Sequence, residues 1–185
     1  MQTIDIEVSR QKFCRELDTF KSIEHTQRKR GIFLLSAEFP NMVLSFAAIK
    51  LQPAPIVFAV RINFDNYDFE APSVRFIDPF TWENLPQVTI PFYRRIPGSP
   101  LPQYLAQKDE QGLPFMCIPG VREYHMHPAH TGDHWLLHRG KDGIGSLGFI
   151  IDKLYEYGIS AIQCYQLNIN TTGLPIFYDP NAIPL

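Results

Sequence analysis

The residues of this sequence best suited to chemistry are one cysteine and the histidines that follow it. Cys117 lies in the run Pro-Phe-Met-Cys-Ile-Pro-Gly, and five of the six histidines follow at positions 125, 127, 130, 134 and 138. A thiol near imidazoles can act as a nucleophile with a base beside it, or as a metal ligand. Both chemistries stay open here, beside the plainer interpretation of a buried cysteine next to a solvated polar loop.

An alternating pattern of ligand-type side chains follows the cysteine. Glu123, His125 and His127 occupy every second position, and alternate residues of a β-strand point to one face. We therefore expect these three side chains to form a row on a strand. Beside Cys117, His125, His127 or His134 would lower the pKa of the thiol or act as a base. Alternatively, Cys117, Glu123, His125 and His127 would hold a metal in tetrahedral geometry. A third possibility is a solvated edge strand.

The other histidines carry weaker signals. Pro128 and Gly132 interrupt the alternation, so the sequence does not give the directions of His130 and His134. Either one could complete a ligand set. His25 and His138 are expected on the surface.

The three thiols are expected to differ in accessibility. Cys14 and Cys164 lie among hydrophobic residues and are predicted to be core thiols. Cys117 is predicted to be exposed at the edge of a cleft, because only an accessible thiolate can meet a bulky substrate. The odd number and wide spacing of the cysteines argue against a disulfide framework.

Composition limits the class of protein. The 185 residues, 45% hydrophobic and 13% aromatic, suffice for a single domain with a sizeable core. The net charge is −2, and no basic run exceeds Arg28-Lys29-Arg30, so a nucleic-acid partner is not expected. No signal-peptide pattern or membrane-spanning stretch is present, which predicts a cytoplasmic protein without a membrane partner.

The elements that would position the thiol follow from periodicity and turn signals. Apolar spacing predicts a helix from about Ile6 to Arg30 that ends at Gly31. Strand-like runs at 32–39, 43–51, 56–64 and 73–77 predict an antiparallel meander. Residues 78–114 are rich in proline and predict an irregular insertion packed on the domain through Phe80, Trp82, Phe92 and Tyr93. Leu147 to Tyr157 has helical spacing, with Ser146 as its cap and Gly158 as its stop.

The run Tyr67-Asp68-Phe69-Glu70-Ala71-Pro72-Ser73-Val74-Arg75-Phe76 resembles the Tyr-Pro-Phe-x-Pro-Pro-x-Val-x-Phe signature of ubiquitin-conjugating enzymes. Met116-Cys117-Ile118 is similar to the Ile-Cys-Leu around their active-site cysteine. The resemblance implies an α+β, UBC-like domain over residues 1–185, with the insertion at about 78–114. It also implies that Cys117 carries a ubiquitin-like protein as a thioester and passes it to an amine, without a cofactor.

The same resemblance implies binding partners, and the sequence also departs from the family's pattern at two motifs. A ubiquitin-like protein and its activating enzyme would be the partners, the latter meeting the first helix near Arg28 and Arg30. The His-Pro-Asn motif that precedes the family's cysteine has no counterpart between Phe76 and Cys117. Trp135 corresponds only loosely to the family's tryptophan after the cysteine. Tyr67, Phe69, Val74 and Phe76 are expected to be packing residues.

A second resemblance concerns the ligand-type residues. Cys117, Glu123, His125 and His127 look like the predicted metal-binding family named for Cys, Glu, His and His. That family occurs in bacterial gene neighbourhoods with ubiquitin-like proteins, their activating and conjugating enzymes, and JAB-type isopeptidases. It implies an accessory protein of the same pathway, non-catalytic or ligase-like, with zinc as the metal. A conjugating-fold scaffold with an inert cysteine would be favoured if Cys117 is buried.

Overall fold

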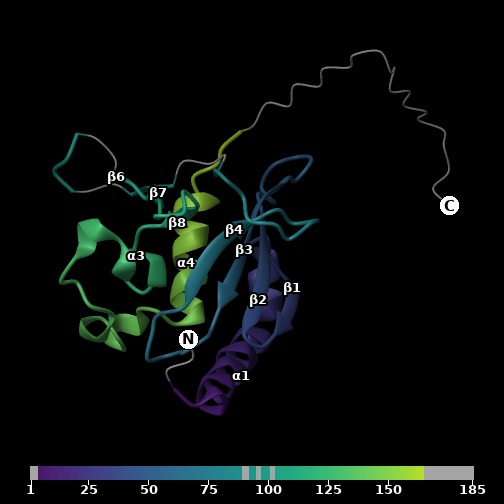
Figure 1. Cartoon of the computed structure of the whole chain (residues 1–185). Coiled ribbons are helices and arrows are strands. Elements are labelled where there is room, and N and C mark those ends of the chain that lie inside the picture. Colours follow the sequence, from purple (N-terminus) through teal and green to yellow (C-terminus); the bar gives the residue numbers. More distant parts are fainter. Residues whose placement is uncertain (1–3, 89–91, 95–96, 101–102, 165–185) are drawn as a thin grey trace.

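The computed structural model describes residues 4–88, 92–94, 97–100 and 103–164. These residues form an α+β structure with an N-terminal helix, a four-stranded antiparallel sheet and a C-terminal helix (Figure 1). Within these ranges, no helix has the length and apolar character needed to cross a membrane.

The N-terminal helix is interrupted once. It comprises α1 (Ile6–Ser22) and α2 (Glu24–Lys29), so the prediction of one continuous helix to Arg30 is wrong at Ile23, whose ψ of 12° leaves the helical range. The Asp5 side chain accepts a hydrogen bond from the Glu7 amide and caps α1. Gly31 ends the helical region as predicted. Its φ is +84°, and a Cβ there would lie 2.2 Å from the Ala47 carbonyl oxygen.

The predicted antiparallel meander is confirmed. Its strands are β1 (Ile32–Glu38), β2 (Asn41–Ala47), β3 (Ile56–Asn63) and β4 (Ser73–Ile77), paired in chain order. The second strand stops at Ala47 and does not reach residue 51, because residues 49–53 form turns and bends. Turn signals and β-branched or aromatic runs thus placed all four strands, with errors at their ends.

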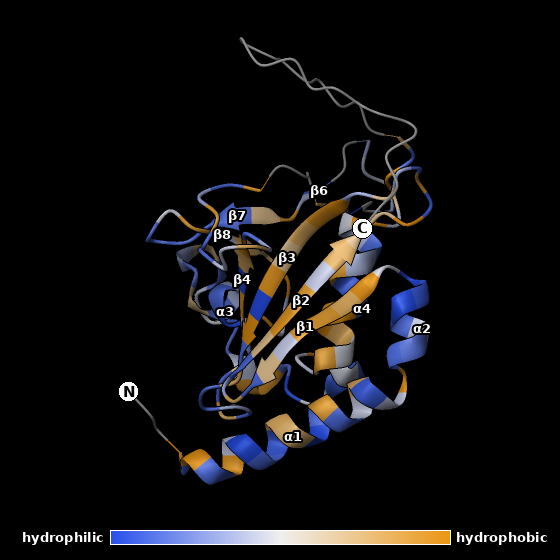
Figure 2. Cartoon of the chain, turned by 90° about the vertical axis from the view of Figure 1, so that its right-hand side faces the viewer, coloured by the Kyte–Doolittle hydropathy of each residue, from blue (hydrophilic) through white to orange (hydrophobic). Residues whose placement is uncertain are grey.

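The main core lies between one face of the sheet and the two long helices. Phe13 and Phe20 of α1 join one buried cluster with residues of the strands and of α4 (Leu147–Gly158). The side chains of Val43, Ala59 and Ile77 form a small separate cluster. Figure 2 shows α1 running beneath the mostly hydrophobic central strands with hydrophilic and hydrophobic residues alternating along it. Ser146 caps α4 by accepting a hydrogen bond from the Phe149 amide, as predicted.

The proline-rich segment contains short paired strands. They are β5 (Tyr93–Arg94) with β6 (Gln103–Tyr104), and β7 (Ala106–Lys108) with β8 (Pro114–Met116). Phe92 is buried in the main core, as expected. Phe80 and Trp82 are exposed, so the prediction that they attach this segment to the domain is wrong.

The histidine-rich stretch is helical, although the sequence predicted a strand. It contains α3 (Arg122–Met126) and three single-turn 3₁₀ helices, η1 (Pro128–His130), η2 (Trp135–Leu137) and η3 (Lys141–Gly143). Consecutive residues of a helix point about 100° apart, so Glu123, His125 and His127 do not share a face. The predicted row of ligand-type side chains is therefore wrong.

Candidate functional site

Cys117 follows β8 and is buried. Its backbone amide donates to the Leu105 carbonyl at 2.7 Å, and the residue is 6% exposed. Cys14 and Cys164 are exposed. The predicted order of accessibility is therefore reversed: Cys14 lies outside the buried face of α1 that Phe13 and Phe20 form, and Cys164 follows α4.

His130 is the histidine that contacts the thiol. Its Nε2 lies 3.1 Å from Cys117 Sγ. Burial raises the pKa of Cys117, and the positive charge of Arg94 on β5 opposes that effect. Burial lowers the pKa of His130, and the nearby His127 acts in the same direction. The imidazole is therefore neutral at neutral pH and can accept the thiol proton.

Tyr124 contacts His130 and links it to Asp133. The Tyr124 ring stacks on the His130 ring with centroids 3.9 Å apart and planes 25° apart. The Tyr124 hydroxyl donates to Asp133 Oδ2 at 2.5 Å, and His138 Nε2 contacts Asp133 Oδ1. Hydrogen bonds from His138 and Tyr124 lower the pKa of Asp133. His138 was expected on the surface but belongs to this cluster.

His125 uses both ring nitrogens within the loop. Its Nε2 accepts from the Gly120 amide at 3.0 Å, which places the proton on Nδ1, where it is donated to the Asp133 carbonyl at 2.8 Å. Burial lowers the pKa of His125, which agrees with a neutral ring. The geometry gives His125 a structural position and leaves no ring nitrogen free for the catalytic role predicted for it.

Glu123 of α3 contacts β4, and His127 directly follows α3. The buried Glu123 carboxylate accepts hydrogen bonds from Ser73 Oγ and from the Val74 amide at 3.1 Å, and it forms an ion pair with Arg75 Nε at 3.3 Å. His127 Nδ1 accepts from the Ala129 amide at 3.2 Å and caps η1. Neither side chain contacts Cys117 in the structure.

The predicted metal ligands are accordingly dispersed. Within residues 4–88, 92–94, 97–100 and 103–164, no group of three or more His, Cys, Asp or Glu side chains is arranged to hold a metal ion. Cys117, Glu123, His125 and His127 each have different neighbours, so the four do not form a ligand set here.

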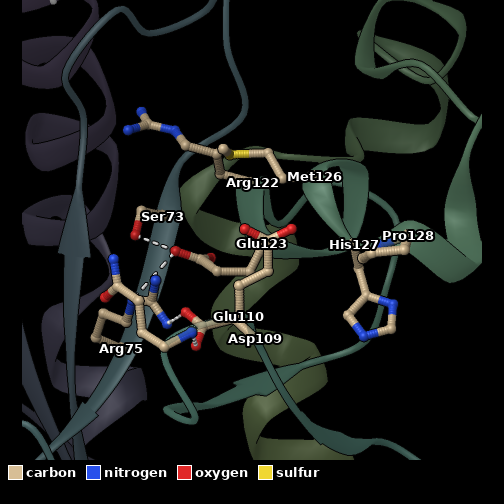
Figure 3. Close-up of a pocket in the computed structure, with 10 residues that line it drawn as sticks. Ser73, Arg75, Asp109, Glu110, Arg122, Glu123, Met126, His127 and Pro128 are labelled. Carbon is tan, nitrogen blue, oxygen red and sulfur yellow. Dashed lines mark hydrogen bonds and ion pairs between the residues drawn. The ribbon is translucent and has the colours of Figure 1, made fainter.

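A pocket of about 300 Å³ lies between α3 and β4 (Figure 3). Glu123 and His127 line it together with Arg75, whose Nη1 pairs with Asp109 at 2.6 Å. The Glu110 side chain extends across the pocket towards α3. A second pocket, of about 330 Å³, shares Arg122 and Met126 with the first and contains Phe69 and Trp135.

The signature-like run folds as the turn between β3 and β4 followed by β4 itself. Tyr67, Val74 and Phe76 are buried, as expected, whereas Phe69 is 46% exposed and is not a packing residue. Trp135 is buried, and its Nε1 donates to the Asp68 carbonyl at 3.2 Å. The tryptophan therefore fixes the cysteine-containing region to this turn.

The basic residues proposed for partner binding are paired within the protein. Arg28 Nη2 lies 2.8 Å from Glu24 Oε1, one helical turn away. Arg30 Nη1 lies 2.7 Å from Asp152 on α4, and its guanidinium stands 4.3 Å from the Tyr155 ring centroid. Their role in binding an activating enzyme stays a prediction.

Sequence reasoning missed most of the partners of Cys117. His130 was recognised as a candidate ligand without a direction, and Tyr124, Asp133 and Arg94 were not singled out. No periodic pattern links these residues, because α3, η1 and β5 are short elements brought together by tertiary contacts. The clustering of histidines after one cysteine was the available signal.

The fold and site define an α+β protein with a buried cysteine–histidine pair beside a four-stranded meander. Comparison with known proteins then places the chain in the Y4jH family, whose model, described as Y4jH-like, matches residues 4–112 and 98–162. A relative from Sinorhizobium fredii (strain NBRC 101917 / NGR234), named "Uncharacterized protein y4jH", is 38% identical over 100% of this chain and 98% of its own length.

Proposed function

We propose that this protein is a cysteine-dependent transferase of the ubiquitin-conjugating type, which carries a ubiquitin-like protein as a thioester on Cys117. The observation that carries the proposal is the 3.1 Å contact between Cys117 Sγ and His130 Nε2. A neutral thiol becomes a nucleophile when an adjacent base removes its proton as it attacks. His130 takes the role of base that the sequence suggested for His125 or His127.

The order of elements supports the conjugating-type fold. A helix, a four-stranded antiparallel meander, a segment containing the cysteine and a final helix follow one another along the chain. The Tyr67 to Phe76 run lies at the end of the meander, where the resemblance would place it. The proposed acyl transfer needs no cofactor, because the thiol itself forms the covalent bond.

The proposed reaction has two acyl-transfer steps. First, the Cys117 sulfur bonds to the carbonyl carbon of the activated C-terminus while its proton moves to His130 Nε2. The bond from that carbon to the activating enzyme's thiolate breaks, and the leaving thiolate takes the proton from His130. Next, an amine nitrogen bonds to the same carbon, the carbon–sulfur bond breaks, and an amine proton reaches the Cys117 sulfur through His130.

One observation favours a different function. Cys117 is 6% exposed and burial raises its pKa, and a structural thiol has both properties. In this second candidate the protein is a scaffold of the same fold, its cysteine is inert, and the contact with His130 is a structural hydrogen bond. The accessory protein with a zinc site at Cys117, Glu123, His125 and His127 has no comparable support in the described residues.

A charging assay separates the two candidates. The protein is incubated with a bacterial activating enzyme, its ubiquitin-like protein and ATP, and adducts are resolved with and without reductant. We expect a reductant-sensitive adduct that is absent from Cys117→Ser and retained by the double variant Cys14→Ser/Cys164→Ser. These two exposed thiols are the matched controls. An adduct that requires Cys14 or Cys164, or no adduct at all, would support the scaffold.

A further inference from the structure

We propose that Asp133 is the residue that positions His130 towards Cys117, and that it acts through the ring of Tyr124. The inference rests on the proposed function in one respect, namely that the Cys117–His130 pair is the reacting pair. It adds the group that orients the base and favours its protonated form during the reaction.

Asp133 joins the segments that enclose the pair. Its carboxylate receives the Tyr124 hydroxyl from α3 and contacts His138 beyond η2. Its carbonyl oxygen accepts the Nδ1 proton of His125, and its amide donates to the His130 carbonyl at 3.0 Å. One residue therefore fixes both the end of η1 and the side chains of α3.

Tyr124 transmits this restraint to the base. Its ring covers one face of the His130 imidazole at 3.9 Å with nearly parallel planes. The orientation of that plane decides whether Nε2 points at Cys117 Sγ. The bond from the Tyr124 hydroxyl to Asp133 prevents the phenol ring from turning, so the histidine ring it covers is held in the productive direction.

The negative charge of Asp133 also favours proton transfer to His130. The side chains whose charges act on the pair are Arg94, His127 and Asp133. Among them, Arg94 stabilises the thiolate and Asp133 favours the protonated imidazole, whereas His127 opposes it. Proton transfer from Cys117 to His130 creates a thiolate and an imidazolium. The positive charge of Arg94 stabilises the thiolate, and the negative charge of Asp133 stabilises the imidazolium.

The test measures thiol chemistry directly and needs no acyl donor. In the Cys14→Ser/Cys164→Ser background, the alkylation rate of Cys117 by iodoacetamide is recorded from about pH 6 to about pH 10. Asp133→Asn should slow alkylation at neutral pH by about three- to tenfold and move the inflection of the profile to higher pH. Asp142→Asn, which neutralises an exposed carboxylate in the same histidine-rich segment, is the matched control and should leave the profile unchanged.

A double-variant comparison decides whether the effect passes through His130. When His130→Ala is already present, Asp133→Asn should have no further effect on the rate. An equal slowing with and without His130, or an unchanged profile in folded Asp133→Asn, overturns the inference. If Asp133→Asn does not fold, Tyr124→Phe replaces it. That variant keeps the stacked ring, loses the bond to Asp133 and should slow alkylation only while His130 is present.

The outcome is distinguishable from failure of the proposed function. A shifted profile in Asp133→Asn together with no adduct in the charging assay would keep the positioning role and discard the thioester chemistry. An adduct on Cys117 together with an alkylation profile that is unchanged in Asp133→Asn would keep the thioester chemistry and discard the positioning role.

Discussion

Cys117 and His130 form a neutral pair in the resting protein, because burial acts on both groups in that direction. It raises the pKa of the thiol and lowers the pKa of the imidazole. A preformed thiolate–imidazolium pair would require stronger opposing charges than Arg94 and Asp133 provide. In the proposed reaction the proton therefore moves when the sulfur attacks, and His130 is the general base of that step.

The neutral histidines predict how stability depends on pH. Burial holds the pKa of His125 and of His130 below 6.5, so below about pH 6.5 the unfolded chain binds more protons than the folded one. The free energy of unfolding should therefore rise with pH through that window and level off above it. Urea unfolding at about pH 5.5 and about pH 7.5 measures the difference.

His125→Gln isolates one contribution to this dependence. Glutamine keeps a donor and an acceptor for the Asp133 carbonyl and the Gly120 amide but does not titrate. The variant should lose less stability than wild type between the two pH values. The matched change His25→Gln, at an exposed histidine on α2, should leave the pH dependence as it is. A wild-type slope in His125→Gln would contradict the account of this residue.

At the scale of single residues, the sequence identified the reacting thiol candidate but not its partner. Cys117 and the histidine cluster stand out by residue type alone. The direction of His130 depends on Pro128 and on the 3₁₀ turn that it begins, which no alternation in the sequence encodes. Arg94 comes from the proline-rich segment, where periodicity gives no guidance. These positions are set by tertiary contacts, and a local pattern carries no signal for them.

At the scale of elements, the long periodic segments were predictable and the short one was not. The meander and α4 follow from strand-like runs, turn residues and a serine cap. The segment from Glu123 to His127, most of which forms α3, could be either strand or helix, because Glu-Tyr-His-Met-His alternates in polarity. Contacts outside the segment decide the outcome: Gly120, at a φ of +92°, turns the chain, and the Arg122 amide donates to the Pro72 carbonyl at 2.9 Å.

Because Glu123 attaches α3 to β4, its removal should lower stability much more than removal of Glu110, which lines the same pocket. The Glu123 side chain is 5% exposed, accepts hydrogen bonds from Ser73 and Val74 and forms an ion pair with Arg75. Glu123→Ala should lower the free energy of unfolding by about 3 kcal/mol, because it leaves the buried Val74 amide without its acceptor and Arg75 Nε without its carboxylate partner.

Glu110 provides the comparison. It points into the same pocket, and the described residues offer it no hydrogen-bond or ion-pair partner. Glu110→Ala should change stability by no more than about 0.5 kcal/mol. Denaturant unfolding of both variants measures the contrast, and equal effects would show that the Glu123 contacts do not hold α3 in place.

At the scale of the whole molecule, the turn between β3 and β4 anchors the cysteine-containing region. The Arg122 side chain donates to the Ala71 and Asp65 carbonyls, and Trp135 donates to the Asp68 carbonyl. Glu16 of α1 links this turn to the start of α4. It accepts from the Tyr67 hydroxyl at 2.8 Å and from the Leu147 amide at 3.1 Å, where a carboxylate also suits the helix N-terminus.

The family match covers the segments that these contacts join. The match to the Y4jH family covers residues 4–112 and 98–162, which include α1, the sheet, Cys117 and all of α4. The cysteine–histidine pair therefore lies inside the unit that defines the family and is not an appendage to it.

The account is tested most directly by the rate of single-turnover charging of Cys117 in two histidine variants. Both are made in the Cys14→Ser/Cys164→Ser background and supplied with the activating enzyme already loaded with the ubiquitin-like protein. His130→Ala should slow charging by about a hundredfold, the scale of losing a general base. His127→Ala, which changes an adjacent ring without touching the thiol, should stay within about threefold of the parent. Equal rates in the two variants would contradict the assignment of His130 as the base for Cys117.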